Sequence, residues 1–223
     1  DISDPFHAKR LGGLDLKGGA AYLVRGDGAT VYVADNVAGL IAADVSDPSR
    51  VRRIKSYKYR VNDLWLDSGY LYIAGRGGLT LLDRSDPSKL VEAALFETDG
   101  KAKLVRASGN LIALYEAGRG VWLLGLEDGG IKTLSLFDPF DDVTDMRLKG
   151  RKLFVFTSKN GLLEVDVTDA LLPVLKAVYP NRANQTTIAV AESSVYFGGG
   201  REITSVAMLP GIMQGIGLSG EVD

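Results

Sequence analysis

Three polar residues could do chemistry because they occupy corresponding positions in repeated segments of the chain: Asp63, Lys103 and Asp145. Ala21 and Thr187 take the same position in two further segments, so we expect the five residues to ring one mouth of a central channel. Two carboxylates and one ammonium group there would bind a cation or a polar ligand. The two carboxylates would also suit the acid and base of glycoside hydrolysis. The alternative, which we favour, is a solvated rim that tolerates any polar residue.

An acidic segment at residues 137–145 is a weaker candidate, with four aspartates in eight residues. Asp138, Asp141 and Asp142 could ligate calcium through their carboxylates. An EF-hand loop also needs a glycine and a distal glutamate, and both are absent here. We therefore interpret the segment as an acidic surface turn and expect no metal site.

Candidate interaction residues fall in two segments. Phe137 and Phe140 flank Pro139; they would make an apolar contact if exposed and would belong to the core if buried. Residues 51–60 hold five cations and two tyrosines, and arginine with tyrosine is typical of interfaces. Charges on an exposed edge strand also prevent sheet-to-sheet aggregation, and we weigh the two explanations equally. The candidates in this segment are Arg52, Arg53, Lys55, Tyr57, Lys58, Tyr59 and Arg60.

Composition excludes several classes of function. The 223 residues contain no cysteine, which excludes disulfides, thiolate metal sites and the Cys-x-x-Cys-His attachment of haem. A single histidine, His7, makes histidine metal sites and a Ser-His-Asp triad improbable on composition. A net charge of -2 gives no general attraction to nucleic acid. No run of 18 apolar residues exists, so we expect no membrane span, and we expect no cofactor.

The elements that position these residues recur about every forty residues. Each repeat carries the mark Asp-x-Ser-Asp-Pro, complete or eroded, at residues 1–5, 44–48, 83–87, 125–129 and 166–170. A fixed period of this size indicates a repeat architecture. Because Asp and Ser side chains bond to backbone N–H groups a residue or two ahead, the mark predicts a compact loop. Calcium is disfavoured, since separate loops do not converge on one ion. The last two copies lack the proline, and we expect looser loops there.

The segments between the marks predict four short strands per repeat. In the clearest copy they lie near residues 52–59, 63–66, 70–74 and 78–82, separated by turns that contain glycine. A glycine opens the fourth strand in four of the five copies. Four antiparallel strands per forty residues is typical of a β-propeller blade, whose two faces are both apolar because blades stack.

Counting the strands predicts an all-β, five-bladed propeller of four-stranded blades. It would form one domain over residues 1–209, followed by a glycine-rich tail at 210–223 that docks on the domain or on another subunit. A lone strand near residues 8–16 would join the last blade as its outer strand and close the ring. The alternative is an open solenoid or a segment of a larger ring. The chain starts inside a mark, and we expect a trimmed or mature product.

The segments 40–48, 79–87 and 162–169, in which an apolar strand runs into the mark, resemble the LVIVD repeat. The resemblance extends from residue 1 to about 208. It implies a β-propeller, usually in secreted or surface-exposed bacterial and archaeal proteins. It implies no activity and no catalytic residues.

From these features we expect a non-catalytic extracytoplasmic propeller. It would be an interaction platform for a protein partner or a structural subunit of a surface assembly formed with copies of itself. The alternative is a carbohydrate-binding protein or a glycoside hydrolase-like enzyme that uses the carboxylates at the channel mouth, where a polar small molecule or glycan would bind.

Overall fold

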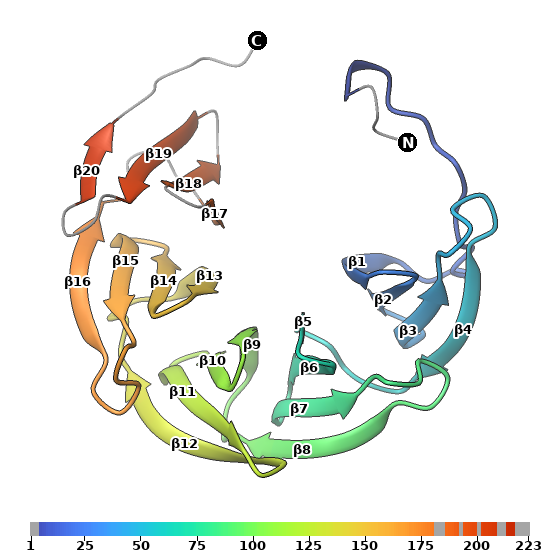
Figure 1. Ribbon diagram of the computed structural model, residues 1–223, viewed down its shortest axis with the longest axis horizontal. Helices are drawn as coiled ribbons and strands as arrows, with labels where there is room; N and C mark the ends of the chain where they lie inside the picture. Colours follow the sequence, from blue (N-terminus) through green and yellow to red (C-terminus); the bar gives the residue numbers. More distant parts are fainter. Residues whose placement is uncertain (1–4, 181–185, 192–193, 200–201, 209–212, 217–223) are drawn as a thin grey trace.

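The computed structural model describes residues 5–180, 186–191, 194–199, 202–208 and 213–216. Within them, five antiparallel sheets of four strands follow one another along the chain and fan into an open arc (Figure 1). The helical content of this part of the chain is one 3-10 turn, η1 (Pro5–His7). No helix in these ranges is long and apolar enough to cross a bilayer.

Successive groups of four strands form the five sheets, and each strand pairs with the next one in its group. In chain order the strands are β1 (Ala21–Asp27), β2 (Thr30–Asp35), β3 (Gly39–Asp44), β4 (Arg52–Tyr57), β5 (Asp63–Asp67), β6 (Tyr70–Gly75), β7 (Gly78–Asp83), β8 (Val91–Glu97), β9 (Ala102–Ser108), β10 (Leu111–Glu116), β11 (Gly120–Glu127), β12 (Gly130–Phe137), β13 (Val143–Lys149), β14 (Lys152–Thr157), β15 (Gly161–Asp166), β16 (Val174–Tyr179), β17 (Thr187–Val190), β18 (Ser194–Gly199), β19 (Glu202–Met208) and β20 (Met213–Ile216).

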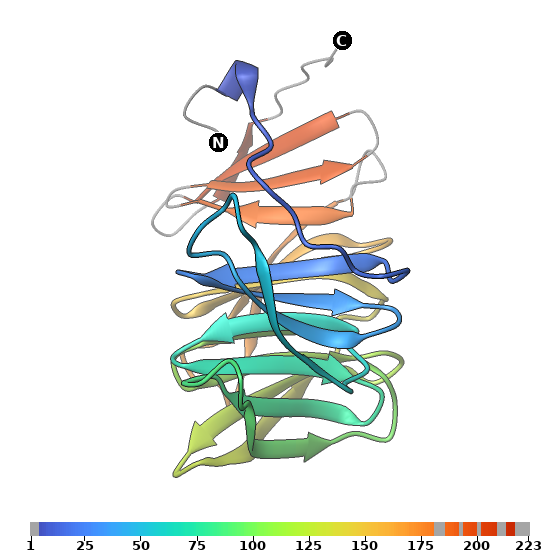
Figure 2. The ribbon, with the colours of Figure 1, turned by 90° about the vertical axis from the view of Figure 1, so that its right-hand side faces the viewer.

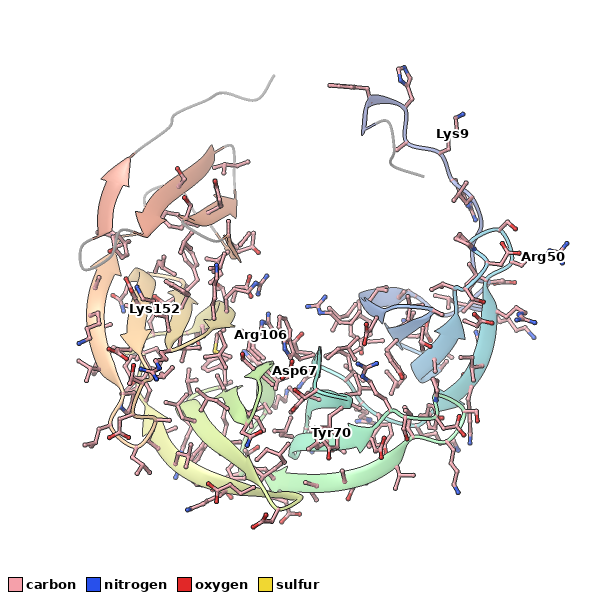
Figure 3. All side chains as sticks on the ribbon, viewed as in Figure 1. Lys9, Arg50, Asp67, Tyr70, Arg106 and Lys152 are labelled. Atoms are coloured by element: carbon pink, nitrogen blue, oxygen red, sulfur yellow. The ribbon has the colours of Figure 1, made fainter. Side chains whose placement is uncertain are left out.

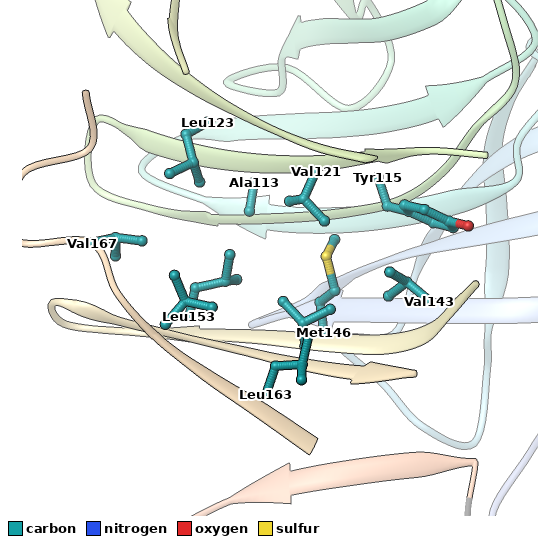
Figure 4. Close-up of a cluster of buried hydrophobic side chains, with 11 residues drawn as sticks. Ala113, Tyr115, Val121, Leu123, Val143, Met146, Leu153, Leu163 and Val167 are labelled. Carbon is teal, nitrogen blue, oxygen red and sulfur yellow. The ribbon is translucent and has the colours of Figure 1, made fainter. Parts of the chain in front are cut away.

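The sheets stack face to face, which explains why their middle strands are apolar on both sides. In β14, five of six residues are buried, and its side chains pack alternately against the sheets before and after it. Figure 4 shows the cluster between the third and fourth sheets, where Val121 and Leu123 face Met146 and Leu153. Each such side chain contributes about 1.5–3 kcal/mol when it is fully buried. Packing between successive sheets therefore holds the arc together.

The sheets are offset by one strand from the sequence repeats. The Asp-Pro loops at residues 45–51 and 84–90 join the third strand of a sheet to its outer fourth strand. The loops at residues 58–62, 98–101 and 138–142 then cross from that outer strand to the inner strand of the next sheet. We call the end of the sheets that carries these three loops the crossover face, and the opposite end the Asp-Pro face.

The predicted closing strand is absent, and no closed ring exists among the described residues. Residues 8–16 form no strand, and β20 is the outer strand of the last sheet. The N-terminal segment, rich in glycine and without β-branched residues, runs from η1 across the side of the arc to β1 (Figure 2). There the Arg53 guanidinium donates to the Asp15 carbonyl at 3.3 Å, and Ala20 N donates to Asn36 Oδ1 at 2.7 Å. Part of the expected tail, residues 213–216, thus belongs to a sheet, and the rest of 210–223 lies outside the described residues.

The Asp-x-Ser-Asp-Pro loops have the side-chain bonds that the sequence predicts. Asp44 Oδ1 accepts from the amide and the hydroxyl of Ser46, at 2.9 and 2.6 Å, and Asp86 bonds Ser88 in the same way at 2.8 and 2.7 Å. The eroded fifth copy keeps the pattern, since Asp166 accepts from Thr168 N at 2.9 Å. Most of the first copy, residues 1–4, lies outside the described residues.

The expectation of a looser loop is wrong for the fourth copy of the mark. Residues 125–129 form no loop there, because β11 and β12 are joined by the two-residue turn Asp128–Gly129. Both residues have positive φ angles, 47° and 77°, as a type I′ hairpin turn requires. Loss of the mark therefore shortened the connection and let both strands grow to eight residues.

Candidate functional site

The five residues expected to ring one mouth of the channel do not share one level. Counted from the first turn of each sheet, Asp63 and Asp145 correspond to each other. They also correspond to Thr187 when the bond from Ala191 N to the Ser194 carbonyl is counted as the first pair of the fifth sheet. The third sheet has Leu104 at that level, and the first has Leu23. Lys103 and Ala21 lie outside the level, since Lys103 is one residue before Leu104 and Ala21 is two residues before Leu23.

Three β-bulges lie at the same end of the inner strands. The pairing skips Tyr22 in β1, Lys103 in β9 and Thr144 in β13. A bulge adds one residue that has no partner across the ladder and turns its side chain out of the regular alternation. Lys103 corresponds to the bulged residue Thr144, and the counterpart of Asp145 is Leu104.

Asp63 is buried and bonds the next sheet. Its Oδ2 accepts from Val105 N at 3.0 Å and from Arg106 Nη1 at 2.5 Å, and its Oδ1 accepts from Leu64 N at 2.9 Å. Arg25 of the first sheet lies 3.8 Å from the same carboxylate. Asp63 therefore connects three sheets.

Asp145 repeats this arrangement two sheets further along. Its Oδ2 accepts from Ile188 N and from the Thr187 hydroxyl, both at 3.0 Å. Its Oδ1 accepts from Arg106 Nη2 at 2.9 Å and from Arg147 Nη1 at 2.5 Å. The carboxylate thus bonds the fifth sheet through Oδ2 and the third through Oδ1.

Arg106 is the centre of this network. Its side chain is 3% exposed, and its two terminal nitrogens bond Asp63 and Asp145. Its Nε donates to the Met146 carbonyl at 2.7 Å, and the guanidinium lies 4.9 Å from the centre of the Trp65 ring. In Figure 3 Arg106 lies on the inner side of the arc. One planar cation therefore links the second, third and fourth sheets, which a guanidinium does better than an ammonium group.

The network determines what the two aspartates can do. All four carboxylate oxygens accept hydrogen bonds from the protein. A general acid needs a proton and a general base needs a free lone pair next to the substrate. Asp63 and Asp145 share a guanidinium instead of flanking an open site. Their geometry suits a bond between sheets and does not suit glycoside hydrolysis.

Three arginines form a positive layer on the inner strands. Arg25, Arg106 and Arg147 occupy the same level of their sheets, each opposite a residue of the second strand. The pKa of Arg147 is lowered, chiefly by burial and further by repulsion from Arg106 and Arg25, while Asp145 opposes the shift. The layer therefore carries more positive charge than its two aspartates balance.

A cavity of about 590 Å³ opens on the crossover face, at the end of the inner strands. The three bulged residues line it, together with residues from the crossover loops and from β9 and β13. The full lining is Tyr22, Val61, Asn62, Lys101, Lys103, Leu104, Val143 and Thr144. Lys103, placed at the channel mouth on sequence, is exposed and does line this cavity. Asp63 and Asp145 do not.

The acidic turn holds its carboxylates apart. Asp138 accepts from Phe140 N at 2.7 Å, Asp141 from the Ser158 hydroxyl at 3.0 Å, and Asp142 from the Tyr115 hydroxyl at 3.0 Å. No group of three or more acidic or histidine side chains suited to a metal ion occurs in the described part of the chain. The carboxylates stabilise the loop through hydrogen bonds.

The two phenylalanines of this turn differ. Phe137 packs against the core between the third and fourth sheets. Phe140 is 76% exposed and has a φ of 58°. A large non-glycine residue with positive φ is uncommon. One of the two candidates is therefore a core residue, and the other is presented to solvent by a constrained backbone.

The basic segment also divides into two groups. Tyr57 and Tyr59 pack into the core between the first two sheets, and the Tyr57 hydroxyl donates to the Pro87 carbonyl at 2.8 Å. Lys58 and Arg60 are exposed in the crossover loop.

Three cations of β4 are already engaged. Arg52 pairs with Asp44 at 2.8 Å, Arg53 contacts the N-terminal segment, and Lys55 donates to the Ser88 carbonyl at 3.0 Å. The free cations of the segment therefore face the crossover end.

Sequence reasoning missed Arg25, Arg106, Arg147 and Lys101. Each arginine stands three residues before the glycine of the first turn, at Gly28, Gly109 and Gly150, so an alignment on these glycines brings the arginines to one level. A usable signal was present: arginine is unusual in an otherwise apolar inner strand, and it requires an acidic partner nearby.

Comparison with known proteins supports the repeat and the architecture. The family model of the LVIVD repeat matches residues 18–58 and 60–98, which cover the first two sheets. No curated protein matches this chain significantly. A solved structure of a computationally designed protein, Ika8, crystallised in P63, is similar with a TM-score of 0.68 at 9% identity. The similarity covers 84% of this chain and 58% of the designed one, so the chain spans less than two thirds of that protein. At this identity the likeness concerns the fold alone.

Proposed function

We propose that this chain, which carries LVIVD repeats, is a non-catalytic five-bladed propeller scaffold that binds a protein partner on its crossover face. The partner is another protein or further copies of the chain in a surface assembly. The extracytoplasmic location is part of the proposal and follows from the repeat, which is usual in secreted and surface proteins. The observation that carries the proposal is Phe140, held in solvent by a strained turn.

Phe140 has the properties of an interface anchor. Its amide donates to Asp138 Oδ1, its φ is positive, and its ring is exposed, whereas Phe137 packs in the core. Residues in such sparsely populated conformations cost about 1–3 kcal/mol each and concentrate at functional sites. An exposed aromatic ring on a rigid turn can enter a partner's pocket with little further loss of entropy.

Cations on the neighbouring loops extend this surface. Lys58 and Arg60 are exposed in the loop at 58–62, and Lys101 is exposed in the loop at 98–101. Arginine and aromatic residues are enriched at the centres of protein interfaces, and lysine is commoner at their rims, so Arg60 is the strongest of the three cations. The crossover face therefore offers one apolar anchor and a basic surround, which suits a partner with an acidic rim.

The scaffold behind this face is rigid. Trp65 Nε1 donates to the Ala107 carbonyl and Asn62 Nδ2 to the Ala102 carbonyl, both at 2.8 Å, and both bonds join the second and third sheets. With Arg106 they fix neighbouring sheets at several levels. Rigid presentation of loops lowers the entropic cost of binding.

The test is partner capture with Phe140→Asn. Asparagine tolerates positive φ, so this variant keeps its fold and its melting temperature while it loses the ring. We expect a partner that co-elutes with the wild-type chain from native source to be lost at least tenfold in the variant, measured by size exclusion with quantitative mass spectrometry.

The matched control is Leu172→Asn, which removes an equally exposed apolar side chain (72%) from the Asp-Pro face. It should retain the partner. Equal retention by both variants, or equal loss from both, would show that the crossover face is not the binding surface.

A further inference from the structure

We propose that the cavity on the crossover face is a binding site for a small anionic molecule, a sugar-sized ring that bears a carboxylate or a phosphate. This site is additional to the protein-binding function proposed above and does not depend on Phe140.

The free hydrogen-bond donors of the cavity are two ammonium groups. The Tyr22 hydroxyl already donates to the Val61 carbonyl at 2.7 Å, and the Thr144 hydroxyl to the Phe156 carbonyl at 3.2 Å. Lys101 and Lys103 are exposed, and among the described residues neither has a carboxylate within 4 Å. They are the two charged residues of the lining. A ligand that carries negative charge would make stronger bonds to both than a neutral one.

The walls that hold the lysines are preformed. The Tyr22 bond joins the first sheet to the crossover loop of the second, and the Asn62 bond to the Ala102 carbonyl joins the second to the third. The bulge in β9 turns Lys103 out of the ladder next to Leu104, which packs in the core. Bulges of this kind re-aim side chains at sheet ends and next to functional sites. The cavity therefore needs no rearrangement to bind.

The electrostatics behind the cavity favour an anion. Arg25, Arg106 and Arg147 lie on the inner strands that border it, against the two carboxylates Asp63 and Asp145. Two further carboxylates lie near the walls, since Asp35 acts on Tyr22 and Glu116 is paired with Ala102. The charged side chains that line the cavity itself are the two lysines. A concave surface with one sign of charge concentrates the field and raises the local concentration of the opposite ion.

The size and the apolar part of the lining narrow the class of ligand. A volume of about 590 Å³ lies within the roughly 300–1,000 Å³ of ordinary small-molecule sites. Tyr22 and Val143 supply apolar surface beside the ammonium groups, and Tyr22 is a ring on which a sugar can stack. A sugar acid or a sugar phosphate combines these features.

The experiment compares three probes built on one ring: galacturonate, galactose 6-phosphate and galactose. Each is titrated calorimetrically into the full chain at low ionic strength. We expect at least one of the two anionic probes to bind at least tenfold more tightly than galactose, and its affinity to fall as salt is added. The preferred anion distinguishes a carboxylate site from a phosphate site. If neither anionic probe binds below about 10 mM, or galactose binds equally well, the proposal is wrong.

Variants then locate the site. Lys101→Gln with Lys103→Gln should weaken anion binding at least tenfold. The control is Lys132→Gln with Lys159→Gln, which removes the same charge from exposed lysines elsewhere. This control should change the affinity for the anion less than twofold. Equal effects of the two pairs would mean general charge attraction and would refute the site. Phe140→Asn should leave anion binding intact, so loss of partner capture and loss of anion binding are separable results.

Discussion

Aspartates at the two ends of this molecule have opposite surroundings. Asp63 and Asp145, on the inner strands, are 5% and 9% exposed in their side chains and bond Arg106. Asp44 and Asp86, in the Asp-Pro loops, bond serines in contact with solvent. The first pair holds different sheets together, and the second pair shapes single loops. Aspartate, which is frequent in the repeats, therefore bonds neighbouring sheets to each other where it is buried. Where it is exposed, it stabilises a single turn.

The comparison indicates which charged side chains contribute most to stability. Water screens the loop carboxylates, so their bonds contribute little each. The inner carboxylates have lost their water and depend on Arg106 for compensation. Removal of one partner from such a buried group leaves charge without compensation, which costs far more than the intact group contributes.

Arg106→Met tests the buried side of the comparison and should have the largest effect. The variant removes the shared cation of Asp63 and Asp145, although both keep bonds to backbone amides and Asp145 keeps its ion pair with Arg147. Asp63 then has only Arg25 at 3.8 Å among the described cations. We expect the free energy of unfolding, measured with urea, to fall by about 3–5 kcal/mol.

A triple variant is the control for this prediction. Asp63→Asn and Asp145→Asn added to Arg106→Met remove the uncompensated charge, and should recover part of the loss. A single variant that loses less than about 1 kcal/mol would mean that water reaches the network, which would contradict its role as a bond between sheets.

Gly78→Ala tests a constraint on the backbone. Its expected effect on stability lies between those of the buried and the exposed aspartates. Gly78 has a φ of 123°, and an added Cβ would lie 2.0 Å from the Phe96 carbonyl oxygen of the outer strand β8. Neither the strand nor the carbonyl can move without breaking the ladder, so we expect a loss of about 2–4 kcal/mol in urea unfolding. Gly77→Ala, at a neighbouring site with open space, should cost less than about 1 kcal/mol. Similar losses in the two variants would refute the steric explanation.

The repeat could be predicted from sequence because each of its parts is local. A loop such as 44–48 bonds its own backbone, and the glycine that opens β7 is required by its own φ angle. Strand existence follows from apolar runs such as β14. These features need no knowledge of what lies in the neighbouring sheet.

The inner network and the open arc could not be predicted, because both depend on distant contacts. The role of Asp63 depends on Arg106, which lies 43 residues away in the next sheet. The outer strand of the last sheet is β20, from a glycine-rich tail, where the sequence favoured a strand from the N-terminus. In both cases the strands within a repeat were predicted correctly. The residue or strand that they contact elsewhere in the fold was not.

Acid titration tests the exposed side of the comparison and should have the smallest effect. Bonds from the hydroxyl and amide of Ser46, helped by Arg52, lower the pKa of Asp44 from 3.8 to about 2. A depressed pKa stabilises the fold above the ordinary value, and this contribution is lost as pH falls from about 4 towards 2. Ser46→Ala should raise the pKa of Asp44, followed by carboxyl ¹³C NMR, and make urea unfolding less sensitive to acid in that range. Asp86 serves as internal control, because Ser88 still lowers its pKa in the same variant. If the pKa of Asp44 does not move, the serine is not its main partner, and the nearby Arg52 would then be the group that lowers it.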